Sequence, residues 1–227
     1  MEVLTWRGLK TYYVLFFLHL ETRRVTIAGI TRHPTEQWMT QMARHAVDDI
    51  DGAFRTIRFA LHDRDSKFCA SFRATLRSGG VRPLLLPARS PNLDAFAERW
   101  VRSIKSECLS QLILFGESSL CRAIAQFLTH YHYERNHQGK ANLLLFPAPN
   151  ERQSHDRSAI RCRERLGGLL KYYHPCCLNF LTLRGHGGFS WIDRSSKIKG
   201  IHVPANDEPH KPSLVEVAFR KLQSGAQ

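Results

Sequence analysis

The sequence lacks any apolar run long enough to cross a membrane. Its longest, Tyr12–Leu20, is interrupted by His19 and falls far short of the roughly 20 residues that a spanning helix needs. We expect no secretory signal, because no basic segment followed by an apolar stretch opens the chain. The six cysteines show no Cys-x-x-Cys spacing, which argues against a zinc site or a disulfide framework. A reduced, cytoplasmic protein is therefore the expectation.

Acidic residues are scarce relative to basic ones. The chain has 20 Asp and Glu against 33 Lys and Arg, a formal net charge of +13 over 227 residues. The excess is spread along the chain, with +7 over residues 1–150, +3 over 151–174 and +3 over 175–227. Such an excess attracts polyanions, either nucleic acid or an acidic membrane surface. Its even spread favours a broad basic face over a single basic tail.

Apolar periodicity predicts strands first, and then strands that alternate with helices. The predicted elements are a hairpin of residues 11–19 and 24–30, a helix opened by Pro34-Thr35-Glu36, a strand at 58–62, a helix capped by Asp65 and ended by Gly79-Gly80, a strand at 81–86, and helices at 90–108 and 119–133. This order is typical of an α/β domain with a mixed sheet. Beyond Pro175 the pattern is lost, and residues 215–222 are compatible with a short strand or a helix.

Two acids stand out by their positions. Asp63 falls at the end of a predicted strand, and Glu98 falls early in the helix that follows the next strand. A strand end and a neighbouring helix can converge at the carboxyl edge of such a sheet, where ligands favour binding. Carboxylates held there can bind Mg²⁺ ions, which activate an attacking hydroxyl and stabilise the leaving oxygen of a phosphodiester. The alternative is an Asp that forms a turn and a Glu that complements a helix dipole.

The helix that carries Glu98 also carries two cations on the same face. Arg102 and Lys105 lie four and seven positions after Glu98, opposite the apolar stripe of the helix. An acid followed by two cations suits a phosphate backbone that lies across the helix. The alternative is an ordinary i,i+4 ion pair on a solvated surface.

Three stretches, in order, carry a family resemblance. They read HDRDSKF at 62–68, SPNLDAFAERWVRSIK at 90–105 and YHYERNH at 131–137. All three resemble the integrase core of bacterial insertion-sequence transposases, a group that shares its fold and acid triad with retroviral integrases. The resemblance spans about residues 2–174.

The resemblance implies an RNase H-like fold and DDE polynucleotidyl transferase chemistry with Mg²⁺ or Mn²⁺. Asp63 is then the second acid and Glu98 the third, both as catalytic residues and as metal ligands, while Lys105 and Arg102 contact DNA. The implied reactions are strand cleavage by water and strand transfer by a DNA 3′-hydroxyl. The implied location is the cytoplasm of a bacterium, at the nucleoid.

The resemblance also has a gap at the start of the chain. In the family the first acid lies on the first strand, a few residues before a turn that reads Thr5-Trp6-Arg7-Gly8-Leu9 here, so its position falls upstream of Met1. Glu2 is the only nearby acid. Because the first strand lies inside the sheet in this fold, we expect an incomplete strand, an incomplete metal site and impaired activity.

The expected organisation is a truncated integrase core at 1–150, a basic family-like extension at 151–174 and an irregular tail of unknown role at 175–227. Four interpretations remain open: a working transposase with a substitute acid, a non-catalytic DNA-binding remnant, a misfolded relic, and a nuclease of the same fold. The expected partners are DNA and either a second copy of the chain or an intact transposase.

Overall fold

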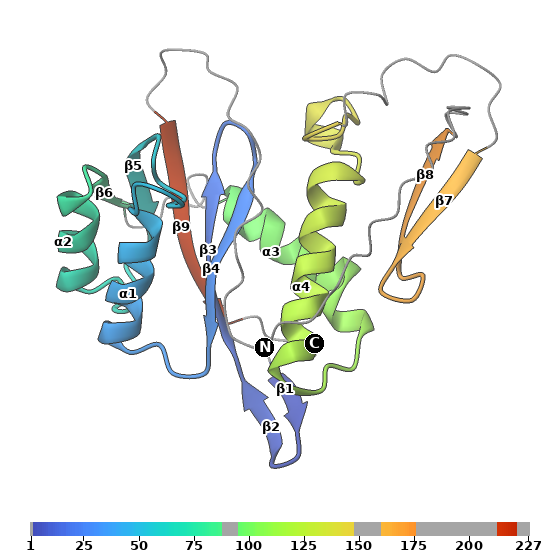
Figure 1. The fold of residues 1–227 in the computed structure, drawn as a ribbon, viewed down its shortest axis with the longest axis horizontal. Coiled ribbons are helices and arrows are strands. Elements are labelled where there is room, and N and C mark those ends of the chain that lie inside the picture. Colours follow the sequence, from blue (N-terminus) through green and yellow to red (C-terminus); the bar gives the residue numbers. More distant parts are fainter. Residues whose placement is uncertain (1, 88–94, 148–159, 176–212, 222–227) are drawn as a thin grey trace, which may run out of the picture.

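The computed structural model describes residues 2–87, 95–147, 160–175 and 213–221. Within these residues the chain forms one five-stranded mixed sheet and two separate two-stranded sheets, with helices on both faces of the larger sheet (Figure 1). The expectation of a mixed α/β fold is therefore confirmed.

The first half of the large sheet is the predicted hairpin. Strand β3 (Tyr13–His19) pairs antiparallel with β4 (Val25–Thr31), and Arg23 takes a positive φ of 63° in the turn between them. The run of apolar and β-branched side chains in β3 buries five consecutive residues, as expected for a strand covered on both faces. The other half holds β5 (Ile57–His62) and β6 (Arg82–Leu85), which run parallel.

The centre of the sheet is filled by strand β9 (Ser213–Lys221), so that the order is β4-β3-β9-β5-β6. Strand β9 runs antiparallel to β3 over seven register pairs, from Tyr13↔Lys221 to His19↔Val215, and parallel to β5. The expectation of an irregular tail is therefore wrong for residues 213–221. Val215 and Val217 supply the β-branched side chains that suit an internal strand, and both are buried.

Two helices cover one face of the sheet. Helix α1 (Glu36–Ala46) begins after Thr35, whose side chain accepts the N–H of Trp38 at 3.2 Å, as expected for an N-cap. Helix α2 (Ala70–Ser78) begins after Cys69. The prediction that Asp65 caps α2 is wrong, because its carboxylate instead accepts the N–H of Lys67 at 2.9 Å in the preceding loop. Met39, Phe72 and Leu76 are fully buried between these helices and the sheet.

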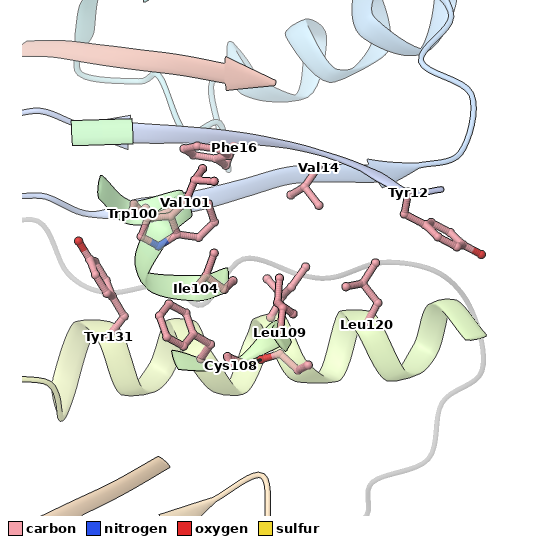
Figure 2. Close-up of a cluster of buried hydrophobic side chains, with 14 of the residues drawn as sticks. Tyr12, Val14, Phe16, Trp100, Val101, Ile104, Cys108, Leu109, Leu120 and Tyr131 are labelled. Atoms are coloured by element: carbon pink, nitrogen blue, oxygen red, sulfur yellow. Dashed lines mark hydrogen bonds between the residues drawn. The ribbon is translucent and has the colours of Figure 1, made fainter. Parts of the chain in front are cut away.

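Two further helices cover the opposite face. Helix α3 (Ala95–Glu107) buries Ala97, Trp100, Val101 and Ile104, and a short 3-10 turn (Leu109–Gln111) follows it. Helix α4 (Gly116–Tyr133) adds Leu120, Ile124 and Phe127. Figure 2 shows Trp100, Val101, Ile104 and Leu120 between β3 and α4. The ring of Trp100 packs against that of Phe16 at a centroid distance of 4.3 Å. Residues 90–92, predicted to cap α3, lie outside the described residues.

The remaining strands form two hairpins outside the large sheet. Strands β1 (Glu2–Thr5) and β2 (Gly8–Thr11) pair with each other, and the N–H of Leu4 donates to the carbonyl of Leu114 at 3.0 Å. Strands β7 (Ile160–Arg165) and β8 (Leu170–Pro175) form the second hairpin, beside α4 (Figure 1). A 3-10 turn (Gln138–Lys140) lies between α4 and this hairpin in the chain. The residues nearest the expected first acid, including Glu2, thus lie in β1, away from the large sheet.

Candidate functional site

Asp63 lies at the carboxyl edge of the large sheet, directly after β5. Its half-buried side chain lines a pocket of about 320 Å³ together with His62, Asp65, Cys69, Arg73 and Leu85. The pocket lies where the parallel strands β5 and β6 end and α2 begins, which is the edge at which ligands of open α/β sheets usually bind. The sequence-predicted acid thus lies in a hollow of the surface.

The loop that carries Asp63 is held by its own polar groups. Asp63 accepts the N–H of Asp65 through Oδ1 at 3.1 Å, and Asp65 binds the Lys67 ammonium at 2.9 Å. His62 donates from Nδ1 to the carbonyl of Asp63 at 2.8 Å. Burial lowers the pKa of His62, so its ring is neutral near pH 7. These bonds fix the backbone on both sides of the Asp63 carboxylate.

Helix α3 presents the second part of the predicted site. Its buried stripe faces the sheet and α4, so the opposite side carries Glu98 and Arg102, both exposed, and Lys105, which is half-buried. Within the described part of the chain, neither Glu98 nor Arg102 forms a salt bridge with another described residue, which removes the ordinary i,i+4 ion pair from the structure. Glu98 and Arg102 are open to solvent, and Lys105 is partly so.

A third acid, which sequence reasoning missed, is Glu216 on the central strand β9. It is 1% exposed, and its Oε2 accepts the N–H of Ala97 at 3.3 Å, one residue before Glu98. Its register partner on β5 is Leu61, two residues before Asp63. The available signal was the alternation in Ser213–Lys221, where Glu216 stands between two valines, but this pattern alone does not show which strands flank it.

The charge of Glu216 is opposed by Arg23, in the turn between β3 and β4. The guanidinium carbon of Arg23 lies 3.2 Å from the centroid of the Phe96 ring, at the start of α3. Burial lowers the pKa of Arg23, and the negative charge of Glu216 is among the influences that raise it again. Glu216 thus lies within electrostatic reach of a guanidinium and is bonded to a helix amide.

The sequence predicts a Mg²⁺ or Mn²⁺ site at Asp63 and Glu98. Their oxygens have the right chemistry for a hard cation, but among the residues that the structure describes, no three His, Cys, Asp or Glu side chains lie close enough to hold a metal ion. Asp63, Glu98 and Glu216 come from adjacent elements without forming such a group.

The Tyr131–His137 segment has contacts inside the fold. His132 accepts the N–H of Val25 through Nε2 at 3.0 Å, and burial lowers its pKa to about 4. Arg135 forms a two-bond ion pair with Glu107 at 2.6 and 2.8 Å. His137 donates from Nε2 to the carbonyl of Tyr131 at 2.8 Å. These contacts tie α4 to β4 and α3, which gives the segment a structural role.

Comparison with known proteins adds no relative. No protein-family model matches the chain, and no curated protein matches it. In the described residues, no helix is both long and apolar enough to cross a membrane.

Proposed function

We propose that the chain is a DNA-binding integrase core of the insertion-sequence transposase type, with impaired strand-transfer chemistry. The observation that carries the proposal is the position of Asp63, in a pocket at the carboxyl edge of the mixed sheet. The next strand is followed by α3, which carries the exposed Glu98 and Arg102 and the half-buried Lys105. In this proposal Asp63 and Glu98 are the catalytic acids, and the two cations contact DNA phosphates.

The sheet order supports the finer proposal of an RNase H-like fold. The resemblance places the first strand of the domain inside the sheet. Here that internal position belongs to β9, antiparallel to β3 and parallel to β5. The proposed fold is thus completed by a strand from the end of the chain.

A second candidate, a DNA-binding protein without catalytic activity, is favoured by one observation. The described acids do not assemble into a group of three that can hold a metal ion. A chain of this kind keeps the basic α3 face and binds duplex DNA, but it does not cut it. The two candidates share the interface and differ only in chemistry.

The first experiment measures binding of a labelled DNA duplex by fluorescence anisotropy at several salt concentrations. Each phosphate contact contributes about 0.9 to the slope of log affinity against log salt. We expect the double variant Arg102→Ala/Lys105→Ala to lower that slope by about 2. Arg44→Ala is the control, because Arg44 is exposed on α1, across the sheet from α3. Equal effects of the α3 variant and the control, or binding that ignores salt, would contradict the proposed interface.

The second experiment separates the two candidates. The purified chain is incubated with labelled DNA and Mg²⁺ or Mn²⁺, beside Asp63→Asn and Glu98→Gln. Weak nicking or joining that both substitutions abolish supports the impaired transposase. DNA binding with no nicking in any of the three proteins supports the non-catalytic candidate.

A further inference from the structure

The β7–β8 hairpin, named here the arginine ribbon (residues 160–175), carries an alternating row of three arginines. Arg161, Arg163 and Arg165 occupy every second position of β7, so they share one face of the ribbon at intervals of roughly 6.8 Å. The register pairs them with His174, Tyr172 and Leu170 of β8. Arg165 bonds to Gln126 of α4 and to Glu134 directly after it, and Leu170 is buried in the same cluster as the apolar side chains of α4, so this face is the one turned toward α4.

One buried carboxylate, that of Glu134 directly after α4, holds the ribbon at the end of β7. Arg165 donates from Nε and Nη2 to the two oxygens of Glu134 at 2.7 and 2.6 Å, and from Nη1 to Gln126 at 3.0 Å. Arg163 adds a longer bond to Glu134 at 3.3 Å. The side chain of Glu134 is 2% exposed, and that of Arg165 is 18% exposed. Bidentate Arg–carboxylate pairs of this kind hold a fixed geometry, so the ribbon is a preorganised arm.

The row of arginines carries more positive charge than its acid partner can neutralise. Burial raises the pKa of Glu134, but hydrogen bonds from Arg165, Arg163 and His130 outweigh this and keep its carboxyl pKa below its ordinary value. One ionised carboxylate thus faces two guanidinium groups. The side chain of Arg163 is 53% exposed, and Arg161 is exposed with no acid bonded to it in the described structure. The positive charge that Glu134 does not neutralise therefore lies toward the start of β7, at Arg161 and Arg163.

The opposite face of the ribbon is different in chemistry. It carries Ile160, Cys162 and Tyr173, together with Glu164 and Lys171, which neutralise each other across the strands at 3.4 Å. One face of the hairpin thus carries cations that no acid neutralises, and the other face has no net charge. A cation on the neutral face, Lys171, can therefore serve as a control for the arginines.

We propose that the arginine ribbon is a second DNA contact, in which Arg161 and Arg163 bind phosphate groups of the duplex while Arg165 and Glu134 hold the arm in place. The inference rests on the proposed function, since it names a further contact with the same DNA. A two-stranded ribbon is narrow enough to follow a groove of duplex DNA, and guanidinium groups bind phosphate with paired hydrogen bonds. An exposed row of two such groups has the charge that a phosphate backbone requires.

The experiment compares anisotropy titrations of a labelled duplex for the whole chain and three variants. Arg161→Ala removes an exposed cation that bonds to no described acid, and Arg161→Ala/Arg163→Ala removes both proposed contacts. Lys171→Ala is the matched control, because it removes a cation from the neutral face of the same hairpin. We expect the salt slope to fall by about 1 for the single ribbon variant and by about 2 for the double, and to stay near wild type for the control. Circular dichroism and the urea midpoint check folding, and the single variant decides if the double is destabilised.

The outcomes separate the ribbon from the proposed function. If Arg102→Ala/Lys105→Ala weakens binding and the ribbon variants match Lys171→Ala, the ribbon inference is wrong and the proposed function stands. If the wild-type chain shows no salt-dependent DNA binding, both are wrong. Binding to vesicles that contain phosphatidylserine, lost in the ribbon variants while DNA binding is kept, would overturn the DNA contact in favour of a membrane surface.

Discussion

The packing of strand β9 can be weakened by substitutions that leave every charged residue in place. The expected loss in the free energy of unfolding follows from the burial of the substituted side chains. Val215 and Val217 are 3% and 2% exposed and face the cluster that includes Phe17, Met39 and Phe54. Each Val→Ala substitution removes two buried methyl-sized groups, worth roughly 0.8 kcal/mol each, and leaves a small cavity. We expect about 2 kcal/mol per site and about 4 kcal/mol for Val215→Ala/Val217→Ala, a large part of the 5–15 kcal/mol typical of a domain.

Urea unfolding measures this loss. With a slope of about 2 kcal/mol per molar urea, the double variant should unfold about 2 M earlier than wild type. Ile113→Ala is the control, because Ile113 is 90% exposed, and its truncation should change the free energy of unfolding by less than about 0.5 kcal/mol. Backbone amides of residues 215–217 should also exchange slowly, since β9 is paired with a strand on both sides there.

One result would refute the reasoning. If Val215→Ala/Val217→Ala unfolds at the same urea concentration as Ile113→Ala, and the amides of β9 exchange freely, then the strand is not part of the core. The sheet would then consist of the β3–β4 hairpin and the β5–β6 pair, with no strand joining them.

Two further predictions concern the contacts of α4. Glu134→Gln leaves Arg165 without its buried carboxylate and should lower the free energy of unfolding by about 3 kcal/mol in urea titrations; an unchanged midpoint would show that the ribbon is not fixed there. Burial lowers the pKa of His132 in the folded protein to about 4, from a value near 6.5 in the unfolded chain. As the pH falls, the unfolded chain therefore binds this proton first, and the free energy of unfolding decreases by about 3 kcal/mol between pH 6.5 and 4. His132→Gln should flatten that part of the pH–stability curve, and a curve identical to wild type would contradict the assigned neutral ring.

The elements that sequence reasoning predicted well are those whose partners are close in the chain. The hairpin of β3 and β4, the N-cap Thr35 and the apolar stripe of α3 each follow from a local period or a capping residue. Strand β9 could not be placed this way. Its neighbours β3 and β5 are about 200 and 155 residues away in the chain, and residues 215–222 are compatible with a strand or a helix when taken alone.

The candidate site divides in the same way. A strand end and a helix face are local properties, so the positions of Asp63 in a pocket and of Glu98, Arg102 and Lys105 on the exposed side of α3 were predictable. Whether acids from separate elements converge depends on tertiary packing, which no local pattern encodes. The role of Glu134 could not be predicted for the same reason. In the sequence it is one residue of the segment 131–137, but in the structure it binds a hairpin about 30 residues further along the chain.

Glu216 connects the stability of the sheet to its proposed chemistry. A buried carboxylate is costly unless it is paired, and this one is compensated by the first turn of α3 through Ala97 and by the charge of Arg23. The N–H groups of a first helical turn have no partner within the helix, so the bond stabilises both groups. The same carboxylate lies on β9, the strand beside β5, and Asp63 follows directly after β5. The bond between Glu216 and Ala97 therefore joins the central strand of the sheet to the helix that carries Glu98, so the stability of β9 and the position of Glu98 depend on the same contact.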